Sequence, residues 1–340
     1  MRNDWKRKAA SVVPNSGTVR RPKVSACMIV KNEERALDRC LSSLHGAVDE
    51  IIVVDTGSVD RTAEIAKAHG AQVSHFDWVN DFSAARNAAL DRATGEWVLS
   101  IDADEWLAHD DSRRFVREAV RTNQRVAYAP WTHLTTGMSY FNSARLFRRE
   151  GNRWEYRVHE QVHFSQPTMG IHDKAFEFMH DGYDPNVIEP GSKNRRNEPM
   201  LRAMVEESPV GSRAWKHATI YLARLHTAPF TPADEQEIIK GLEVAAGFDE
   251  MSTQVLSLRL YRQWIEAGRF DELNGLNERV LSLGAGSPMV YLVEAVRRFE
   301  ASDLPGAREA MAQMEAAQDL VSARQAMSGM VENLKRLIGS

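Results

Sequence analysis

The sequence predicts an α/β domain built on a mostly parallel sheet, followed by an all-helical domain. Strand and helix signals alternate from residue 24 to residue 101, which is typical of parallel strands joined by right-handed crossovers. Strand signals disappear from about Glu198, and apolar residues then recur at spacings of three and four. We expect a disordered basic arm at residues 1–22, the α/β domain at residues 23–197 and the helical domain at residues 198–340.

The strands and helices of the α/β domain are predicted in order along its first part. A strand at Val24–Lys31 precedes a helix whose apolar residues repeat at helical spacing, namely Leu37, Cys40, Leu41 and Leu44. Further elements are predicted at Ile51–Val54 (strand), Asp60–Ala68 (helix), Val73–Phe76 (strand), Phe82–Arg92 (helix) and Trp97–Ile101 (strand). Gly70 follows the second helix and marks its end, because glycine readily adopts the left-handed conformation there.

The last of these strands ends in three carboxylates, Asp102, Asp104 and Glu105. Ligands of open α/β sheets bind at the carboxyl ends of the strands, so these acids lie where a ligand is expected. Residues i and i+2 of an extended chain project to the same side, and hard oxygen donors suit Mg²⁺ or Mn²⁺. The segment therefore predicts a metal site; the structural alternative is a polar turn whose acids cap the next helix.

Four motifs of the front domain resemble those of the family-two glycosyltransferases of the GT-A fold. They are M-I-V-K-N-E-E (Met28–Glu34), V-D-E-I-I-V-V-D-T-G-S-V-D-R-T (Val48–Thr62), D-F-S-A-A-R-N (Asp81–Asn87) and D-A-D-E (Asp102–Glu105). The resemblance is closer still to the branch with lipopolysaccharide-core glucosyltransferases, glycocin peptide S-glycosyltransferases and bacterial proteins with tetratricopeptide-like tails. It implies inverting, metal-dependent transfer of a hexose from a UDP-sugar to an acceptor nucleophile, with Mn²⁺ or Mg²⁺ as cofactor.

The resemblance also implies which residues bind the donor. Asp55 matches the acid that accepts a hydrogen bond from the uracil ring, although an acid at this place can also be a turn residue. Arg86 matches the basic residue that faces the nucleotide, with a helix-surface ion pair as the alternative. Asp102 matches the acid near the ribose and the metal, and Asp104 the direct metal ligand. The other implied nucleotide-sugar contacts are Val30, Asn32, Glu33, Gly57, Ser58 and Ala103.

Glu160 is the expected catalytic base. The run Ala144–Arg148, Trp154, Tyr156 and Val158–Glu160 resembles the R-L-F-R…Y…V-H-E pattern of this branch, in which the Glu occupies the base position. Direct displacement at the anomeric carbon needs a group that takes the acceptor proton, and one carboxylate opposite the leaving group suffices. The alternative is a surface Glu on an edge strand, and His159 and His163 are weaker candidates.

His180 is the expected third metal ligand. It lies in M-H-D-G-Y, which resembles a segment from which family members supply an imidazole to the metal, and His172 is its competitor. With Asp104 it would form a mixed carboxylate and imidazole set that suits Mn²⁺. Farther along, Lys193 and Arg196 resemble the cations of a K-x-x-R-N segment, which would clamp the diphosphate or cap a helix that begins near Glu198.

The helical tail carries a faint internal repeat. E-A-G-R-F-D-E-L (Glu266–Leu273) and E-A-S-D-L-P-G-A (Glu300–Ala307) lie 34 residues apart, the period of a tetratricopeptide unit. Phe270 then matches Leu304 and Leu273 matches Ala307, and we expect these positions to pack one helix of a pair on the other. Earlier helices are predicted at Ala214–His226 and Pro232–Ala246. Three degenerate repeats or a helical bundle would brace the catalytic domain, form a homodimer or bind an acceptor peptide.

Composition sets further bounds. With 340 residues, 43% of them hydrophobic, the chain can bury two cores, and its net charge of −4 does not indicate a nucleic-acid partner. No secretory signal is apparent and no apolar run approaches the roughly 20 residues that span a bilayer, so we expect a soluble cytoplasmic protein without a transmembrane segment. Cys27 and Cys40 lie in apolar surroundings and are expected to behave as small hydrophobic residues.

Two other function classes deserve comparison. A sugar nucleotidyltransferase would need a Gly-rich basic loop after the first strand, where this chain has K-N-E-E. A non-catalytic scaffold would bind partners through its helical repeats, but this chain retains the acidic and basic residues of the donor site. The sequence leaves the acceptor open among a glycan, a peptide Ser or Cys and a modified nucleobase, since acceptor choice depends on variable loops such as Thr132–Asn142.

Overall fold

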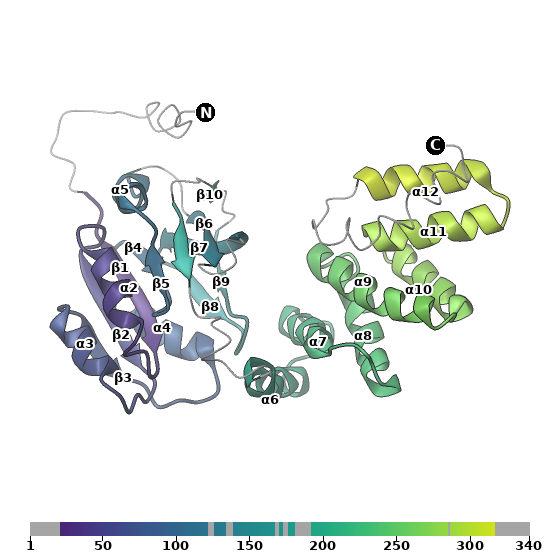
Figure 1. Ribbon diagram of the computed structural model, residues 1–340. Coiled ribbons are helices and arrows are strands. Elements are labelled where there is room, and N and C mark those ends of the chain that lie inside the picture. Colours follow the sequence, from purple (N-terminus) through teal and green to yellow (C-terminus); the bar gives the residue numbers. More distant parts are fainter. Residues whose placement is uncertain are drawn as a thin grey trace. The chain divides into compact units, whose positions relative to one another are not determined.

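The computed structural model describes residues 21–121, 126–133, 139–166, 170–172, 176–180, 192–284 and 286–316 (Figure 1). The chain divides into two compact units, Met1–Ser192 and Lys193–Ser340. All described strands belong to the first unit, and the described part of the second is helical. Of the expected basic arm at residues 1–22, all but Arg21 and Pro22 lies outside the described residues.

The first unit is built on one large sheet that is mostly parallel. Its strands follow the order β3 (Gln72–His75), β2 (Glu50–Asp55), β1 (Val24–Val30), β4 (Trp97–Ser100), β7 (Ser139–Arg148), β6 (Val126–His133), β11 (Phe178–His180) and β5 (Glu105–Leu107), with β10 (Gly170–His172) paired to β6. The strands β3, β2, β1 and β4 are parallel to one another, whereas β7 runs antiparallel to both β4 and β6. A separate two-stranded sheet joins β8 (Arg153–Glu155) to β9 (Gln161–His163).

The helices of this unit connect the parallel strands. They are α2 (Leu37–Leu44), α3 (Thr62–Ala68), α4 (Phe82–Arg92) and, after the fourth strand, α5 (Asp110–Ala119). The predicted order of strands and helices up to Trp97–Ile101 is therefore confirmed, and the sheet is of the mostly parallel type that the GT-A resemblance implied. The strands from β5 onward had no counterpart in the sequence prediction. Part of the expected variable loop Thr132–Asn142 lies in β6 and β7, with residues 134–138 outside the described range.

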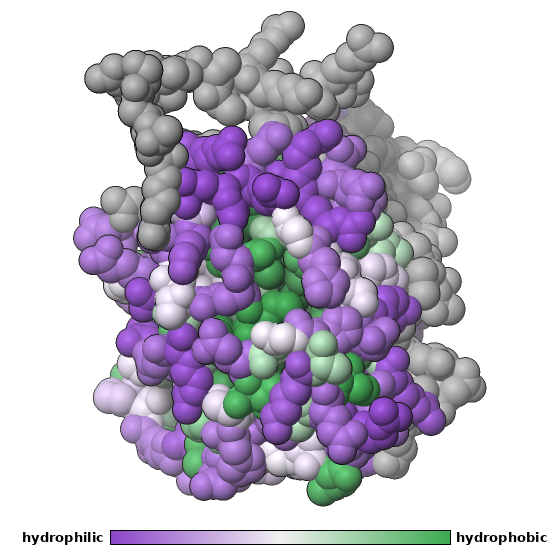
Figure 2. Space-filling view, turned by 90° about the vertical axis from the view of Figure 1, so that its left-hand side faces the viewer, coloured by the Kyte–Doolittle hydropathy of each residue, from purple (hydrophilic) through white to green (hydrophobic). Residues whose placement is uncertain are grey.

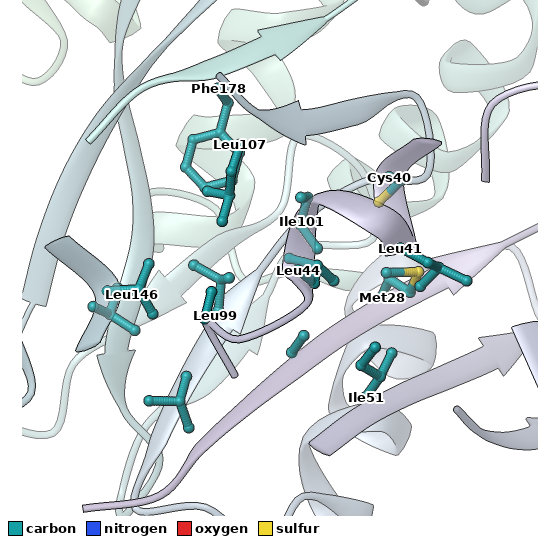
Figure 3. Packing of buried hydrophobic residues seen from close by; sticks show 14 of the residues in the cluster. Met28, Cys40, Leu41, Leu44, Ile51, Leu99, Ile101, Leu107, Leu146 and Phe178 are labelled. Carbon is teal, nitrogen blue, oxygen red and sulfur yellow. The ribbon is translucent and has the colours of Figure 1, made fainter. Parts of the chain in front are cut away.

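Side chains that alternate along β1 form the two cores of the sheet. Val24, Ala26 and Met28 face the cluster that contains α2 and α5, whereas Cys27 faces the cluster that contains α4. Figure 3 shows residues of the first cluster, with Leu41 of α2 near Met28. Burial raises the pKa of the Cys27 thiol to about 12, which fits the predicted role of a small hydrophobic residue.

The outer edge of the sheet is formed by the short strand β3. Figure 2 shows this side of the first unit, where hydrophilic residues surround a smaller hydrophobic area. A strand of four residues whose ends are exposed offers little edge for pairing with another chain. Among the described residues, no helix of either unit has both the length and the apolar character needed to cross a membrane.

The described part of the second unit consists of seven successive helices. They are α6 (Ser192–Glu207), α7 (Arg213–Leu225), α8 (Pro232–Ala245), α9 (Glu250–Glu266), α10 (Phe270–Ser282), α11 (Pro288–Glu300) and α12 (Leu304–Ala316). The apolar faces of α7 to α12 share one core, which includes Leu242, Leu260, Leu276 and Leu292. The helical tail that the sequence predicts is therefore confirmed.

Two details of the tail differ from the prediction. The helix expected to begin near Glu198 begins at Ser192, and its first six residues are polar and show no apolar spacing that would have predicted them. Pro199 lies inside the helix, where it removes a backbone hydrogen bond and crowds the preceding turn. Phe270 and Leu304, expected to pack between helices, are 55% and 40% exposed. Each is the first residue of its helix, so its side chain lies at the end of the helix and not along its buried face.

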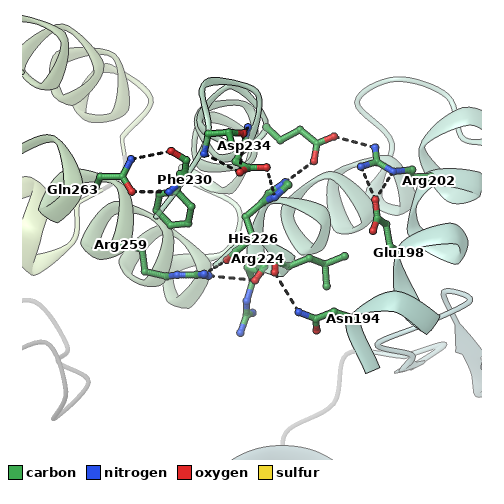
Figure 4. A network of polar contacts seen from close by, with 12 residues as sticks. Asn194, Glu198, Arg202, Arg224, His226, Phe230, Asp234, Arg259 and Gln263 are labelled. Atoms are coloured by element: carbon green, nitrogen blue, oxygen red, sulfur yellow. Dashed lines mark hydrogen bonds and ion pairs between the residues drawn. The ribbon is translucent and has the colours of Figure 1, made fainter. Parts of the chain in front are cut away.

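Polar contacts fix the connection between α7 and α8 (Figure 4). His226, which follows α7, lies between Asp234 (2.9 Å) and Glu237 (2.7 Å) of α8. From α9, the Arg259 guanidinium donates to the backbone carbonyl of His226, and the Gln263 side chain pairs with the backbone of the same connection. Three consecutive helices are thus tied together by side chains that bind backbone groups at a helix end.

Candidate functional site

The candidate site lies at the carboxyl ends of β1, β2 and β4, where two loops are joined by hydrogen bonds. The Asn32 amide donates to Ser58 Oγ (2.9 Å), and the Asn32 side-chain oxygen accepts from the Val59 amide (2.8 Å). The amide of the next residue, Glu33, donates to Thr62 Oγ1 (2.7 Å). Asn32 has a left-handed backbone, with φ of 58°, which Asn tolerates better than most residues. The loops after β1 and β2 therefore form one rigid wall of the site.

Asp55 ends β2 and supports this wall. Its Oδ1 accepts the amides of Gly57 (3.1 Å) and Ser58 (2.8 Å), so it has the geometry of a turn residue, the alternative that the sequence left open. Its second oxygen, Oδ2, has no hydrogen-bond partner among the described residues. The turn role and an acceptor role toward a ligand are thus compatible, since they use different oxygens.

Arg86 of α4 joins two of the predicted site acids. Its Nη2 donates to Asp102 Oδ1 (2.8 Å) and its Nε donates to Glu160 Oε1 (2.7 Å). The Arg86 side chain is only 12% exposed, and its guanidinium lies 5.0 Å from the centre of the Trp154 ring. In this structure Arg86 therefore faces two carboxylates, and the acids 102 and 160 are held by one cation.

This arrangement affects the charge of Asp102. Burial would raise the pKa of Asp102, but the nearby guanidinium groups of Arg86 and Arg145 outweigh it and hold the pKa at about 2. Asp102 is thus ionised at neutral pH. Its side chain remains 39% exposed, so a ligand at the sheet edge can reach it.

Glu105 is set apart from the other acids by a buried ion pair. Its two oxygens accept from Arg145 Nη1 (2.9 Å) and Nη2 (2.5 Å), and Oε2 also accepts the Asp102 amide (2.9 Å). Burial raises the pKa of Glu105, and Arg145 offsets part of this. Glu105 therefore fixes the turn that carries Asp102 and Asp104. The sequence analysis included Arg145 in a motif but did not identify this partner.

Asp104 and His180 are brought together by the pairing of β5 with β11. Their nearest atoms, Asp104 Oδ1 and His180 Nδ1, lie 3.5 Å apart, and His180 is buried. Burial would lower the pKa of His180, but the contact with Asp104 outweighs it and raises the pKa above its ordinary value. The structure thus places two of the three expected metal ligands side by side, although they are 76 positions apart in the sequence.

The donor set fits a divalent cation that arrives with a phosphate ligand. Two atoms 3.5 Å apart can both contact one ion at about 2.1 Å. Among the described residues, no group of three His, Cys, Asp or Glu forms a complete metal site. Mg²⁺ and similar ions commonly take one or two protein ligands and complete their coordination with substrate phosphates and water.

The other predicted residues lie in several places. Val30 and Ala103 are buried beside the site, and Gly57 has φ of 105°, a conformation that glycine adopts without strain. Lys193 and Arg196 lie on the first turns of α6 in the helical unit, and their contact with a diphosphate stays a prediction.

The histidines that were weaker candidates do not join the pair of Asp104 and His180. His159 directly precedes Glu160 and has φ of 55°, and His163 lies 3.7 Å from Glu155 on the small sheet. The side chain of His172 lies outside the described residues. Within the described part of the chain, His180 is thus the imidazole that meets an expected metal ligand.

Comparison with known sequences gives consistent matches to glycosyltransferases. Residues 25–179 match the family model Glycosyl transferase family 2. A TPR repeat-containing protein of Synechococcus elongatus is 44% identical over 142 residues, which cover 41% of this chain and 35% of that protein. The SPbeta prophage-derived glycosyltransferase SunS of Bacillus subtilis is 31% identical over 200 residues, which cover 55% of this chain and 46% of that protein. The chain therefore spans less than half the length of either relative.

Two solved structures also match this chain at low identity. TarS 1–349 of S. aureus covers 88% of this chain and 95% of its own, at 18% identity and a TM-score of 0.43. Glucosyl-3-phosphoglycerate synthase from Mycobacterium tuberculosis, in complex with Mn²⁺, UDP and phosphoglyceric acid, covers 34% of this chain and 44% of its own, at 23% identity and a TM-score of 0.29. The family model extends from the second residue of β1 to the second residue of β11, so it includes Asp104, whereas His180 lies one residue beyond it. Over residues 25–179, just under half of its length, this chain is therefore similar to the glycosyl transferase family 2 domain.

Proposed function

We propose that this chain is an inverting glycosyltransferase that moves a hexose from a UDP-sugar to an acceptor nucleophile with the help of Mn²⁺ or Mg²⁺. The observation that carries the proposal is the single guanidinium of Arg86, which binds both Asp102, beside the metal ligands, and Glu160, the expected base. The two chemical tasks of the reaction, release of the diphosphate and removal of the acceptor proton, would then be carried out at adjoining places.

The donor would bind at the wall formed by the loops after β1 and β2. Asp55 Oδ2, which is not used within the described part of the protein, would accept the uracil N–H. Asp104 and His180 would hold the divalent cation, with Asp102 beside them. When bound, the cation would neutralise the charge that grows on the departing diphosphate. Lys193 and Arg196 are proposed to contact the same diphosphate.

Glu160 would take the acceptor proton. Its Oε1 accepts from Arg86, which leaves Oε2 as the oxygen that can accept a proton from an incoming hydroxyl or thiol. The ion pair also fixes the direction of the carboxylate, since the Arg86 guanidinium is nearly buried and rests against Trp154. Displacement from the side opposite the diphosphate would invert the anomeric carbon.

The name of the relative SunS, a glycosyltransferase, supports the reaction class. The acceptor of this chain stays open among a glycan, a peptide Ser or Cys and a modified nucleobase, and the helical unit is proposed to brace the transferase domain, to form a homodimer or to bind an acceptor peptide.

A thermal-shift experiment tests the donor site. The protein is heated with UDP and a panel of UDP-sugars, each with Mn²⁺ or with a chelator, and a ligand at about 100 times its Kd should stabilise the folded state by about 2.7 kcal/mol. Asp104→Ala should abolish the metal-dependent shift, whereas Glu160→Gln should keep the shift and lose turnover. Asp271→Ala, an exposed acid of the helical unit, serves as the matched control. A wild-type protein that shows no shift with any of these ligands would overturn the donor assignment.

A further inference from the structure

The α4 helix makes a continuous set of contacts with the segment that carries Glu160. This segment, residues 154–160, is here called the base segment. At one end, the Asn87 side chain pairs with both backbone groups of Trp154: Asn87 Nδ2 donates to the Trp154 carbonyl (3.0 Å), and the Trp154 amide donates to Asn87 Oδ1 (3.0 Å). An amide side chain that binds both groups of one residue fixes the backbone direction as a neighbouring strand would. The same contact places the Trp154 ring beside the Arg86 guanidinium.

The middle of the base segment is bound by the first turn of α4. Ser83 Oγ donates to the Tyr156 carbonyl (2.5 Å), and the Phe82 amide donates to the Arg157 carbonyl (2.8 Å). The Phe82 amide is one of the donors at a helix start that have no partner within the helix. At the far end, Arg86 binds Glu160 itself. Contacts from α4 therefore recur along the whole base segment.

The base segment has a backbone that needs such support. Tyr156 and His159 adopt left-handed conformations, with φ of 74° and 55°, which residues with a side chain rarely adopt. Conformations of this kind persist where the surrounding contacts determine them, and they cost on the order of 1–3 kcal/mol each. Hydrogen bonds from Ser83 and Asn87 to the neighbouring carbonyls act at the right places to maintain them.

The geometry points to Ser83 and Asn87 as positioning residues for Glu160. Neither side chain lies against the acids at the strand ends; both act through the backbone of the base segment, and so they determine where the Glu160 carboxylate meets Arg86. The motif D-F-S-A-A-R-N then has a second role besides any contact with the nucleotide, namely to hold the Glu160 carboxylate in position. This inference rests on the proposed function, in which Glu160 is the base.

The test compares Ser83→Ala and Asn87→Ala with variants that keep part of each contact. Turnover of a UDP-sugar with Mn²⁺, in which water serves as the acceptor and the free sugar is formed, is measured by UDP release. Donor binding is measured by the thermal shift with UDP and Mn²⁺. Displacement of a reacting group by about 1 Å can lower turnover by about 100-fold, so we expect kcat to fall between about 10- and 100-fold while KM for the donor changes less than about twofold. Ser83→Thr, which keeps the hydroxyl, should restore kcat, and Asn87→Asp, which keeps the acceptor for the Trp154 amide, should give an intermediate value.

Hydrogen exchange measures how firmly the base segment is held, independently of activity. Backbone amides of the base segment should exchange faster in Ser83→Ala and Asn87→Ala, while amides of β1 and β4 keep their wild-type rates. Ser282→Ala and Asn274→Ala remove side chains of the same size from α10 in the helical unit and should change neither readout.

The outcomes separate this inference from the proposed function. A fall in kcat at constant donor KM, together with faster exchange confined to the base segment, supports the positioning role. The positioning role is overturned if both alanine variants keep the kcat of the wild type. It is also overturned if they lose kcat together with donor binding. A wild-type protein that binds and turns over no UDP-sugar overturns the proposed function, and the positioning role for that reaction falls with it.

Discussion

The buried pair of Arg145 and Glu105 provides a sharp test of how the site is built. Their side chains are 9% and 4% exposed, and two hydrogen bonds join them. Glu105→Gln keeps the shape of the side chain but leaves the guanidinium without its bonded carboxylate. Removal of one partner from a buried ion pair costs about 3–5 kcal/mol, because the remaining charge is left uncompensated. That is a large part of the roughly 5–15 kcal/mol by which a domain is stable.

The free energy of opening of the first unit can be measured through hydrogen exchange of amides in β1 and β4. A loss of about 3–5 kcal/mol should accelerate the slowest of these amides roughly a hundred- to a few-thousand-fold. Asp91→Asn serves as the control, because it removes the acid of an exposed ion pair in which Arg153 is 56% and Asp91 57% exposed. It should change the same exchange rates by less than about fivefold.

A double variant isolates the unpaired charge as the cause. Glu105→Leu combined with Arg145→Met removes both charges and should be more stable than Glu105→Gln alone. Exchange in Glu105→Gln less than tenfold faster than in the wild type, or a double variant less stable than the single one, would refute the reasoning.

Three further predictions concern packing, pH and reactivity. Gly241→Ala in α8 should destabilise the helical unit by about 1–3 kcal/mol in urea unfolding, because the added methyl group would overlap that of Ala223. Gly275→Ala, on the open face of α10, should stabilise the same unit by up to about 1 kcal/mol. Equal effects of the two substitutions would contradict the packing described. The pKa of Glu237 lies below its ordinary value of 4.5: burial raises it, but hydrogen bonds from His226 and Arg202 outweigh this. Its contribution to stability is therefore complete above pH 4.5 and is lost as pH falls through the lower folded pKa, and Glu237→Gln should flatten the acid limb of the melting temperature against pH. Cys27 should resist iodoacetamide at pH 8 in the native protein and react after unfolding, since its pKa is raised to about 12 by burial; rapid native labelling would contradict this.

The part of the fold that could be predicted is the part with strong periodic signals. The strands Val24–Val30 and Trp97–Ser100 were identified from their apolar runs, with predicted bounds Val24–Lys31 and Trp97–Ile101, and the helix Leu37–Leu44 from its apolar spacing. The strands β5, β8, β9, β10 and β11 have three residues each, too few to show a period of two, and their existence depends on long-range pairing. The start of α6 was misplaced because its first six residues, 192–197, are all polar and show no apolar spacing.

The candidate site shows the same division. The position at a strand end identified Asp102 and Asp104 as site candidates, and the family resemblance supplied their expected roles. The i, i+2 rule does not apply to them, because β4 ends at Ser100 and residues 103–104 form a turn. The sequence could not show that Arg86 meets Glu160, because the two residues are 74 positions apart and only the docking of the base segment on α4 brings them together. Glu105 follows the two expected aspartate ligands in the sequence, but its buried partner Arg145 comes from a different strand, and the pair fixes the turn before β5.

The hydrogen bonds between the loops after β1 and β2 have a consequence for how the sequence can change over evolution. Asn32 gives its amide to Ser58 and receives that of Val59, so neither loop can alter its path alone without leaving backbone groups unpaired. We expect substitutions at positions 32, 58 and 62 to occur together among related chains, and a loop transplanted from another transferase to require its opposite loop as well. A change of donor preference would then require both loops to change together.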